Sequence, residues 1–144
     1  MPELMAIAAD LSQPLPTRLP FDRVLVDAPC SGLGTVRRRP EVKWRVQESD
    51  LQRLAALQRR ILHHCSDALA DRGMLLYVTC STEMEENEGV VEAVTSDRPD
   101  LRRVPVELVP GLDPRMVGND GYFRTYPHFP DLEGFFAAAI ERRC

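Results

Sequence analysis

Two short apolar runs, each followed at once by a polar residue or a cysteine, predict buried strands at residues 21–26 (FDRVLV) and 74–79 (MLLYVT). The first run ends at Asp27 and the second at Cys80. An earlier apolar run, residues 4–9, is interpreted as a strand or as the last turn of a helix. Three prolines follow it, so residues 11–20 are expected to form an irregular connection.

Between the two strands, apolar residues recur every three or four positions, as they do on one face of an amphipathic helix. Ser49 is the expected N-cap with Gln52 as its capping-box partner, and Gly73 is the expected C′ residue. The apolar face comprises Leu51, Leu54, Ala55, Leu57, Ile61, Leu62, Cys65, Ala68 and Leu69.

The remaining pattern predicts one more helix and two more strands. Thr82 and Glu85 form a second capping box, for a helix to about residue 95 that Pro99 ends. Two strands are predicted at residues 122–126 and 135–140. They are too close in sequence for a crossover helix, so we expect them to pair antiparallel. The order strand, loop, helix, strand, helix implies an α/β domain with a parallel sheet.

The composition is that of one soluble globular domain, with 144 residues of which 44% are hydrophobic and 28% charged. No apolar run is long enough to cross a membrane, and residues 1–9 lack the basic region of a signal peptide. We therefore expect a cytoplasmic protein whose four cysteines are thiols. No C-x-x-C pair occurs, and the adjacent His63 and His64 make poor metal ligands, so no metal site is expected.

The net charge of −4 argues against an extensive nucleic-acid-binding surface, yet one segment is strongly basic. Its side chains are candidates for contacts with the phosphates of a nucleic acid; the alternative is a solvated loop. The segment contains Arg37, Arg38, Arg39, Lys43 and Arg45. Trp44, within it, is expected either to stack on a base or to pack against the following helix.

Asp27, Cys30 and Cys80 follow the carboxyl ends of the two predicted strands. A single crossover helix joins these strands, and such a connection usually makes them neighbours in the sheet. Ligands in open α/β sheets bind at the carboxyl ends of strands, so the three side chains are expected to line one crevice. Taken singly, a cysteine is more often a small core residue, and an aspartate after a strand is often a turn residue.

Taken together, these segments closely resemble the paired motifs of the Sun (Fmu) family of RNA (cytosine-5)-methyltransferases. The family's Pro-Cys motif corresponds to residues 27–32 (DAPCSG), and its Thr-Cys motif to residues 79–81 (TCS). Further similarity lies at residues 34–44, 57–62, 86–88 (ENE), 124–128 (RTYPH) and 133–136 (EGFF). Glu133 stands where the family usually has Asp, and Met84 where Pro is common. The resemblance covers about residues 8–143.

The resemblance implies a fold and roles for particular residues. The fold would be a partial Rossmann-like S-adenosylmethionine-dependent methyltransferase fold, with a parallel sheet and an antiparallel C-terminal strand pair, in a single domain spanning residues 1–144. Cys80 would attack cytosine carbon 6, Cys30 would assist release of the methylated RNA, and Asp27 would bond the cytosine edge. The residues at S-adenosylmethionine would be Asp10, Asp27 and Pro29. The RNA contacts would be Arg37, Arg38, Arg39, Lys43 and Trp44, and ribosomal RNA is the expected substrate.

Part of the family's catalytic domain has no counterpart in the sequence. No Gly-rich turn follows a first strand, and no acidic ribose-binding residue follows a second. The chain is interpreted as the C-terminal portion of the domain, and the missing N-terminal half as a possible separate partner chain. A truncated sequence, a split enzyme and a degenerate descendant are the open explanations. Two other functions remain open, namely a non-catalytic RNA-binding remnant and a thiol redox protein that uses Cys30 and Cys80.

The protonation state of Cys80 is also left open by the sequence. Cys80 precedes the predicted start of a helix, and a helix N-terminus favours a thiolate. Four glutamates between residues 83 and 88 oppose a second negative charge there.

Overall fold

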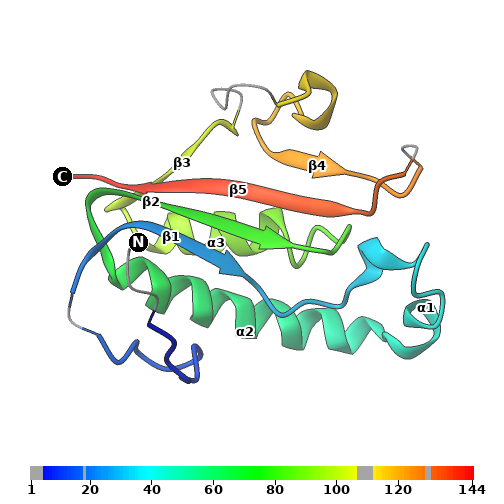
Figure 1. The fold of residues 1–144 in the computed structure, drawn as a ribbon, viewed down its shortest axis with the longest axis horizontal. Coiled ribbons are helices and arrows are strands. Elements are labelled where there is room, and N and C mark those ends of the chain that lie inside the picture. Colours follow the sequence, from blue (N-terminus) through cyan, green and yellow to red (C-terminus); the bar gives the residue numbers. More distant parts are fainter. Residues whose placement is uncertain (1–4, 18, 107–111, 129–130) are drawn as a thin grey trace.

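The computed structural model describes residues 5–17, 19–106, 112–128 and 131–144 (Figure 1). Its centre is a five-stranded sheet in the order β1-β2-β5-β3, and β4 pairs with β5 off this path. The strands are β1 (Phe21–Asp27), β2 (Leu69–Thr79), β3 (Leu101–Val104), β4 (Phe123–Thr125) and β5 (Phe135–Arg142). The α-helices are α1 (Val42–Arg45), α2 (Glu48–Asp67) and α3 (Glu88–Asp97), with short 3-10 turns at Leu33–Thr35 and Pro114–Met116.

The strand pairing confirms two predictions and corrects a third. β1 and β2 are parallel neighbours, in register from Arg23↔Met74 to Asp27↔Val78. β4 and β5 form the expected antiparallel pair. The sheet is nevertheless mixed rather than parallel, because β5 runs antiparallel to β2 and β3 as well. β3 was not predicted, since the segment has only four residues, two of them arginines.

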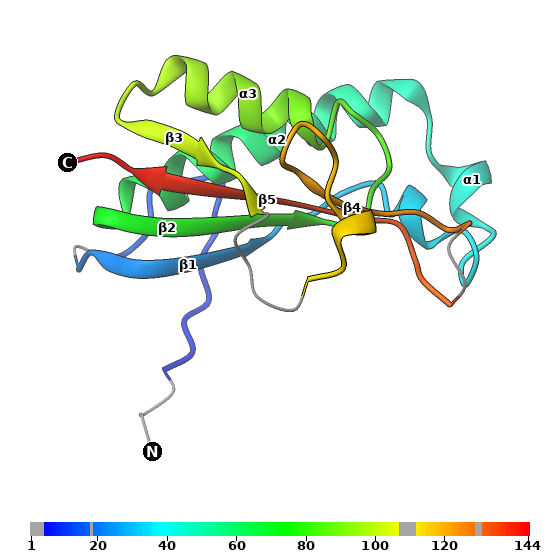
Figure 2. The same ribbon diagram turned by 90° about the horizontal axis from the view of Figure 1, so that it is seen from above.

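Both long helices lie on the same face of the sheet (Figure 2), and the core fills the space between them and the strands. Alternate residues of the central strands point into this layer, as the period of a strand requires. The least exposed apolar strand side chains, at 0–1%, are Leu75, Tyr77, Phe136, Ala138 and Ile140. From α2 the buried residues include Ala55, Ile61, Leu62 and Cys65, which belong to the predicted apolar face.

The opposite face of the sheet is apolar as well, but the described residues leave much of it exposed. Leu25 is 68% exposed although its neighbour Val26 is 4% exposed, and Leu76, which lies beside Leu25 in the sheet, is 40% exposed. β1 also forms one edge of the sheet. Sheets with parallel βαβ units normally carry helices on both faces, so this face and edge are suited to packing against further protein.

The predicted ends of the first helix were wrong by a few residues. α2 begins at Glu48, and its capping box is formed by Gln47 with Asp50 instead of by Ser49 with Gln52. The helix ends at Asp67, so Gly73 is not its C′ residue but a member of β2. A Cβ atom on Gly73 would lie 2.9 Å from the Phe21 carbonyl oxygen, so this position needs glycine for close approach of the two strands.

Three further expectations are corrected. The second helix begins at Glu88 rather than near Thr82, because the side chains between these positions are held in other contacts. The described residues of segment 4–9 form neither strand nor helix, and Leu4 lies outside the described residues. The loop predicted after β1 is confirmed apart from one 3-10 turn, but the short helix α1 that follows it was not predicted.

Candidate active site

The sulfur atoms of Cys30 and Cys80 lie 3.3 Å apart. Each cysteine stands in the loop that follows its strand, and the β1–β2 hydrogen bonds continue one residue past β1, from Ala28 N–H to the Val78 carbonyl at 2.9 Å. Both thiols are partly buried. The expectation that these two cysteines, fifty positions apart in the sequence, lie close together is confirmed.

The loop after β1 is locked against the loop after β2 by its backbone. Gly34 N–H donates to the Cys80 carbonyl at 3.0 Å, and Gly134 N–H donates to the Gly34 carbonyl at 2.7 Å. A Cβ atom on Gly34 would lie 2.0 Å from the Gly134 oxygen and 2.8 Å from the Cys80 oxygen. Only glycine fits there. Gly34 therefore allows its own loop, the loop of Cys80 and the segment at Gly134 to come into backbone contact.

A buried carboxylate joins the same two loops through side chains. Glu86 is 0% exposed. Its Oε1 accepts from Ser31 N–H at 2.8 Å and from Gln58 Nε2 at 3.0 Å. Its Oε2 accepts from the hydroxyls of Ser31 at 2.5 Å and Ser81 at 2.6 Å. The sequence pattern alone did not predict this cluster, although Gln58, a glutamine at a core-facing position of an apolar helix, was a signal that could have found it.

Three more hydrogen bonds fix the loop that carries Cys80. The Thr79 hydroxyl donates to Asn87 Oδ1 at 2.6 Å, and Asn87 Nδ2 donates to the Ser81 carbonyl at 3.0 Å. The Tyr77 hydroxyl donates to the Glu86 carbonyl at 2.7 Å. These bonds use the polar groups of residues 79–87 and explain why α3 starts later than its sequence pattern suggests.

The two thiols differ in acidity. The hydrogen bond from the Cys30 thiol lowers the pKa of Cys80 to about 7, against the opposing effects of partial burial and of the charges of Asp27 and Glu86. The same bond and burial raise the pKa of Cys30 above its ordinary value. Cys80 is therefore the thiol that is more readily ionised. The N-terminus of α3 is not adjacent to Cys80 and does not cause the lowered pKa, because α3 begins eight residues after Cys80.

The three residues expected at the cofactor have different surroundings. Asp27 is exposed at the carboxyl end of β1, and its charge acts on Cys80. The Pro29 carbonyl accepts a hydrogen bond from Gln58 Nε2 at 2.8 Å. Asp10 is exposed, and hydrogen bonds from the Ser12 side chain and the Ser12 N–H within its own turn hold its pKa below the usual range.

The basic segment borders Cys30. Arg39 and Arg45 line a hollow of about 290 Å³ together with Cys30 and Ser31. Arg37 and Arg38 reach the other way, to Asp131 at 3.5 Å and to Glu133 at 3.2 Å.

Trp44 is 80% exposed, and the Lys43 ammonium lies 4.8 Å from its ring centroid. The alternative that Trp44 packs against the following helix is therefore wrong, and its ring is accessible to a ligand.

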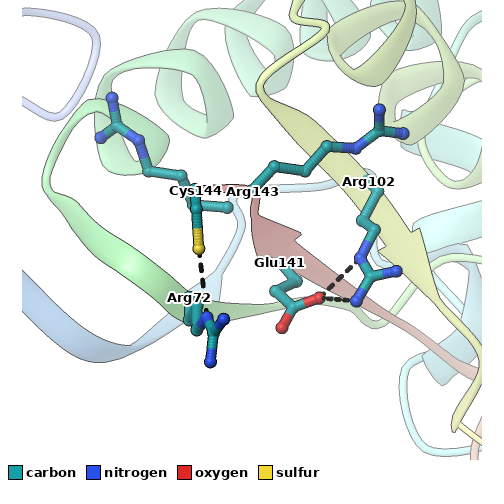
Figure 3. Close-up of a pocket in the computed structure, with 6 residues that line it drawn as sticks. Arg72, Arg102, Glu141, Arg143 and Cys144 are labelled. Carbon is teal, nitrogen blue, oxygen red and sulfur yellow. Dashed lines mark hydrogen bonds and ion pairs between the residues drawn. The ribbon is translucent and has the colours of Figure 1, made fainter.

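A larger concavity, about 580 Å³, lies elsewhere (Figure 3). It is lined by Arg72, Arg102, Glu141, Arg142, Arg143 and Cys144. These residues gather around the C-terminal end of β5, which is antiparallel to β2, so the concavity is at the opposite end of the sheet from Cys80 (Figure 1). Arg102 is held by Glu141 at 2.6 Å, and Arg72 by the Cys144 sulfur at 3.1 Å.

Two other features bear on the sequence expectations. His63, His64 and Asp67 have possible metal-ligand atoms within 4.8 Å of one another, but Asp67 is also paired with Arg98 at 2.7 Å. None of the helices in the described ranges combines the length and hydrophobicity that a membrane span requires.

Residues 1–141 match the family model described as 16S rRNA methyltransferase RsmB/F. The chain belongs to the RsmB/F methyltransferase family. Among RsmB/F relatives, ribosomal RNA small subunit methyltransferase B of Thermus thermophilus is 41% identical over 79% of the chain and 30% of its own length. The mouse 28S rRNA (cytosine-C(5))-methyltransferase is 38% identical over 85% of the chain and 17% of its own length.

Solved structures agree with this assignment. NSun6 from Pyrococcus horikoshii with SFG superposes with a TM-score of 0.77 at 27% identity, over 94% of the chain and 34% of that protein. A methyltransferase homologue from the same organism gives a TM-score of 0.66 at 31% identity, over 86% of the chain and 40% of that protein. The RsmB/F chain thus spans only 17–40% of the length of these four relatives.

Proposed function

We propose that this chain carries the two catalytic thiols of an RNA (cytosine-5)-methyltransferase that acts on ribosomal RNA. The observation that carries the proposal is the pair of sulfur atoms 3.3 Å apart at the ends of neighbouring parallel strands, one of them with a lowered pKa. A single buried cysteine has no such partner. Two thiols of unequal acidity suit a reaction in which one sulfur adds to the substrate and the other acts afterwards.

Cys80 supplies the nucleophile in this proposal. Cytosine carbon 5 is a poor nucleophile, but addition of the Cys80 thiolate to carbon 6 moves the electron pair of the 5,6 double bond toward carbon 5. The cofactor would supply a methyl group on a positively charged sulfur, which carbon 5 attacks. A base then removes the carbon-5 proton, and the electron pair of that carbon–hydrogen bond re-forms the 5,6 double bond as the carbon–sulfur bond to Cys80 breaks and the thiolate leaves.

Cys30 and Asp27 have supporting roles. Cys30 lies beside Cys80 and is proposed to assist the elimination that frees the methylated RNA. Asp27 is exposed at the end of β1 and is proposed to hydrogen-bond the cytosine edge, supporting the charge that develops on the ring.

RNA is proposed to enter along the basic segment. A base must leave the stack, or come from a single-stranded loop, to reach a thiol. The hollow lined by Cys30 and Arg39 offers space for it. Arg37, Arg38, Arg39 and Lys43 would hold flanking phosphates, and the exposed Trp44 ring would stack a neighbouring base.

The cofactor in this proposal is S-adenosylmethionine, of which the SFG bound by the NSun6 relative is an analogue. The residues of this chain fit it only in part. Asp27 is exposed at the carboxyl end of β1, where ligands of open α/β sheets bind, whereas Asp10 is hydrogen-bonded within its own turn. With Pro29 they are the proposed cofactor contacts. We therefore propose that the remainder of the family domain, on the same polypeptide or on a partner chain, packs against the free edge of β1 and completes the site.

The test is methyl transfer by the assembled enzyme, meaning this chain together with the remainder of the family domain. Labelled S-adenosylmethionine and ribosomal RNA are incubated with the wild type, with Cys80→Ala and with Cys144→Ala, and 5-methylcytosine is measured. Cys80→Ala is expected to abolish the product, because carbon 5 is no longer activated. Cys144→Ala, which removes the exposed terminal thiol, is the control and is expected to retain activity. Product formed by Cys80→Ala at the wild-type rate would contradict the proposal.

A further inference from the structure

We propose that Glu86 is the positioning residue of the cysteine pair, tying the loop of Cys30 to the loop of Cys80 and thereby setting the separation of the two thiols. The catalytic meaning of this inference rests on the proposed function, but its geometric content does not. Glu86 touches neither sulfur through a hydrogen bond; it acts through the residues beside them.

The bonds to Glu86 come from three separate segments. Ser31 directly follows Cys30 and bonds Glu86 through both its N–H and its hydroxyl. Ser81 directly follows Cys80 and bonds the same carboxylate through its hydroxyl. Gln58 reaches in from α2. One side chain thus holds the residue next to each thiol, and its bond to Gln58 anchors both loops to α2.

The chemistry of the four partners explains why the position carries a carboxylate. All four groups donate, and a carboxylate is an acceptor through both oxygens with room for about four hydrogen bonds. A fully buried carboxyl group without such partners would be strongly unfavourable. Two of the bonds, at 2.5 and 2.6 Å, have the length of hydroxyl bonds to a charged oxygen.

The orientation of Gln58 supports the same conclusion. Its amide nitrogen donates both to Glu86 and to the Pro29 carbonyl, while its buried Oε1 has no hydrogen-bond partner. An unpaired buried oxygen is unfavourable. It is tolerated here because turning the Gln58 amide around would place its oxygen against two other acceptors, the Pro29 carbonyl and Glu86 Oε1. Gln58 is therefore arranged to serve Glu86 and the Pro-Cys loop.

The test uses a reagent that bridges two nearby thiols, dibromobimane, which becomes fluorescent after both its ends have reacted. It needs neither RNA nor cofactor, so its outcome is independent of whether the proposed methyl transfer is correct. All variants carry Cys144→Ala to remove the exposed terminal thiol. The rate of bridging, divided by the rate of reaction with iodoacetamide, reports the alignment of Cys30 with Cys80.

Glu86→Ala is expected to lower this ratio by about fivefold or more. Glu86→Gln is expected to keep most of it, because the amide oxygen accepts from two donors and the serine hydroxyls can turn to accept from the amide nitrogen. Glu85→Ala is the matched control, since Glu85 is the adjacent residue and is exposed, and it is expected to leave the ratio unchanged. An undiminished ratio in Glu86→Ala would overturn the proposal.

Two further variants keep the test decisive if Glu86→Ala does not fold, as judged by circular dichroism. Ser31→Ala and Ser81→Ala each remove one hydroxyl bond to Glu86 and are expected to lower the ratio to intermediate values; wild-type ratios in both would also overturn the proposal. Glu86→Gln is further expected to shift the pH profile of Cys80 alkylation to lower pH, because the charge of Glu86 raises the pKa of Cys80. Glu85→Gln is expected to leave the profile unshifted, and an unshifted Glu86→Gln profile would count against the arrangement.

Discussion

At the scale of single residues, the reactivity of Cys80 comes from its neighbour. Two thiols in contact cannot both ionise easily, so one becomes the hydrogen-bond donor and the other the better thiolate. The sequence located both cysteines correctly because strand ends can be recognised from apolar runs. The sequence could not supply the cause of the lowered pKa of Cys80, because the Cys30–Cys80 hydrogen bond depends on where the folded structure places the two side chains.

This cause predicts a pH dependence of alkylation. Reaction of Cys80 with iodoacetamide is expected to rise with pH through about 7 and to fall away below it, because the pKa is lowered from 9.0. Cys30→Ala removes the hydrogen-bond donor, so the midpoint is expected to move up toward 9.0, and the rate at neutral pH to fall by about tenfold or more.

Peptide mass spectrometry measures Cys80 and the exposed Cys144 in the same sample, so Cys144 serves as an internal control that the variant should not affect. An unchanged midpoint for Cys80 in Cys30→Ala would contradict the assigned cause.

At the scale of elements, the sequence predicted what periodicity determines. β1, the main part of β2, α2 and the two C-terminal strands have long or regular apolar patterns, and all were found. The errors lie where local signals compete. Ser49 with Gln52 is as good a capping box in sequence as Gln47 with Asp50, and Thr82 with Glu85 gave way to the buried contacts of Glu86 and Asn87. The buried cluster itself was missed because polar residues that meet across fifty positions leave no periodic trace.

The meeting of the loops predicts an effect of glycine substitution. Gly34→Ala would push a Cβ atom into two carbonyl oxygens, so it is expected to lower the free energy of unfolding by about 1–3 kcal/mol or more, the usual range for overpacking. Gly32→Ala is the matched control: its φ of 75° disfavours alanine by about 1 kcal/mol, yet a Cβ there meets nothing closer than 3.8 Å. Urea unfolding followed by circular dichroism measures both, and a smaller loss for Gly34→Ala than for Gly32→Ala would contradict the packing described.

At the scale of the whole molecule, the described residues cover the two faces of the sheet unequally. α2 and α3 cover one face of the sheet (Figure 2), whereas Leu25 and Leu76 on the other face are exposed and β1 is an edge strand. The matched relatives are several times longer than the chain, and we propose that segments corresponding to the remainder of those relatives pack against this exposed surface. The sequence anticipated this from the lack of a Gly-rich turn. Because no Gly-rich turn of the cofactor site is present, we predict that the 144-residue chain alone binds S-adenosylmethionine weakly or not at all.

The central claim is that Cys80 forms a covalent bond to the RNA and that Cys30 is needed to release it. The most direct measurement incubates the assembled enzyme with cofactor and ribosomal RNA and separates the products on a denaturing gel. Cys30→Ala is expected to accumulate a protein–RNA adduct that survives denaturation, because methyl transfer proceeds but elimination is blocked. Cys80→Ala and the double variant are expected to show no adduct. An adduct in Cys80→Ala and none in Cys30→Ala would contradict the account by making Cys30 the nucleophile.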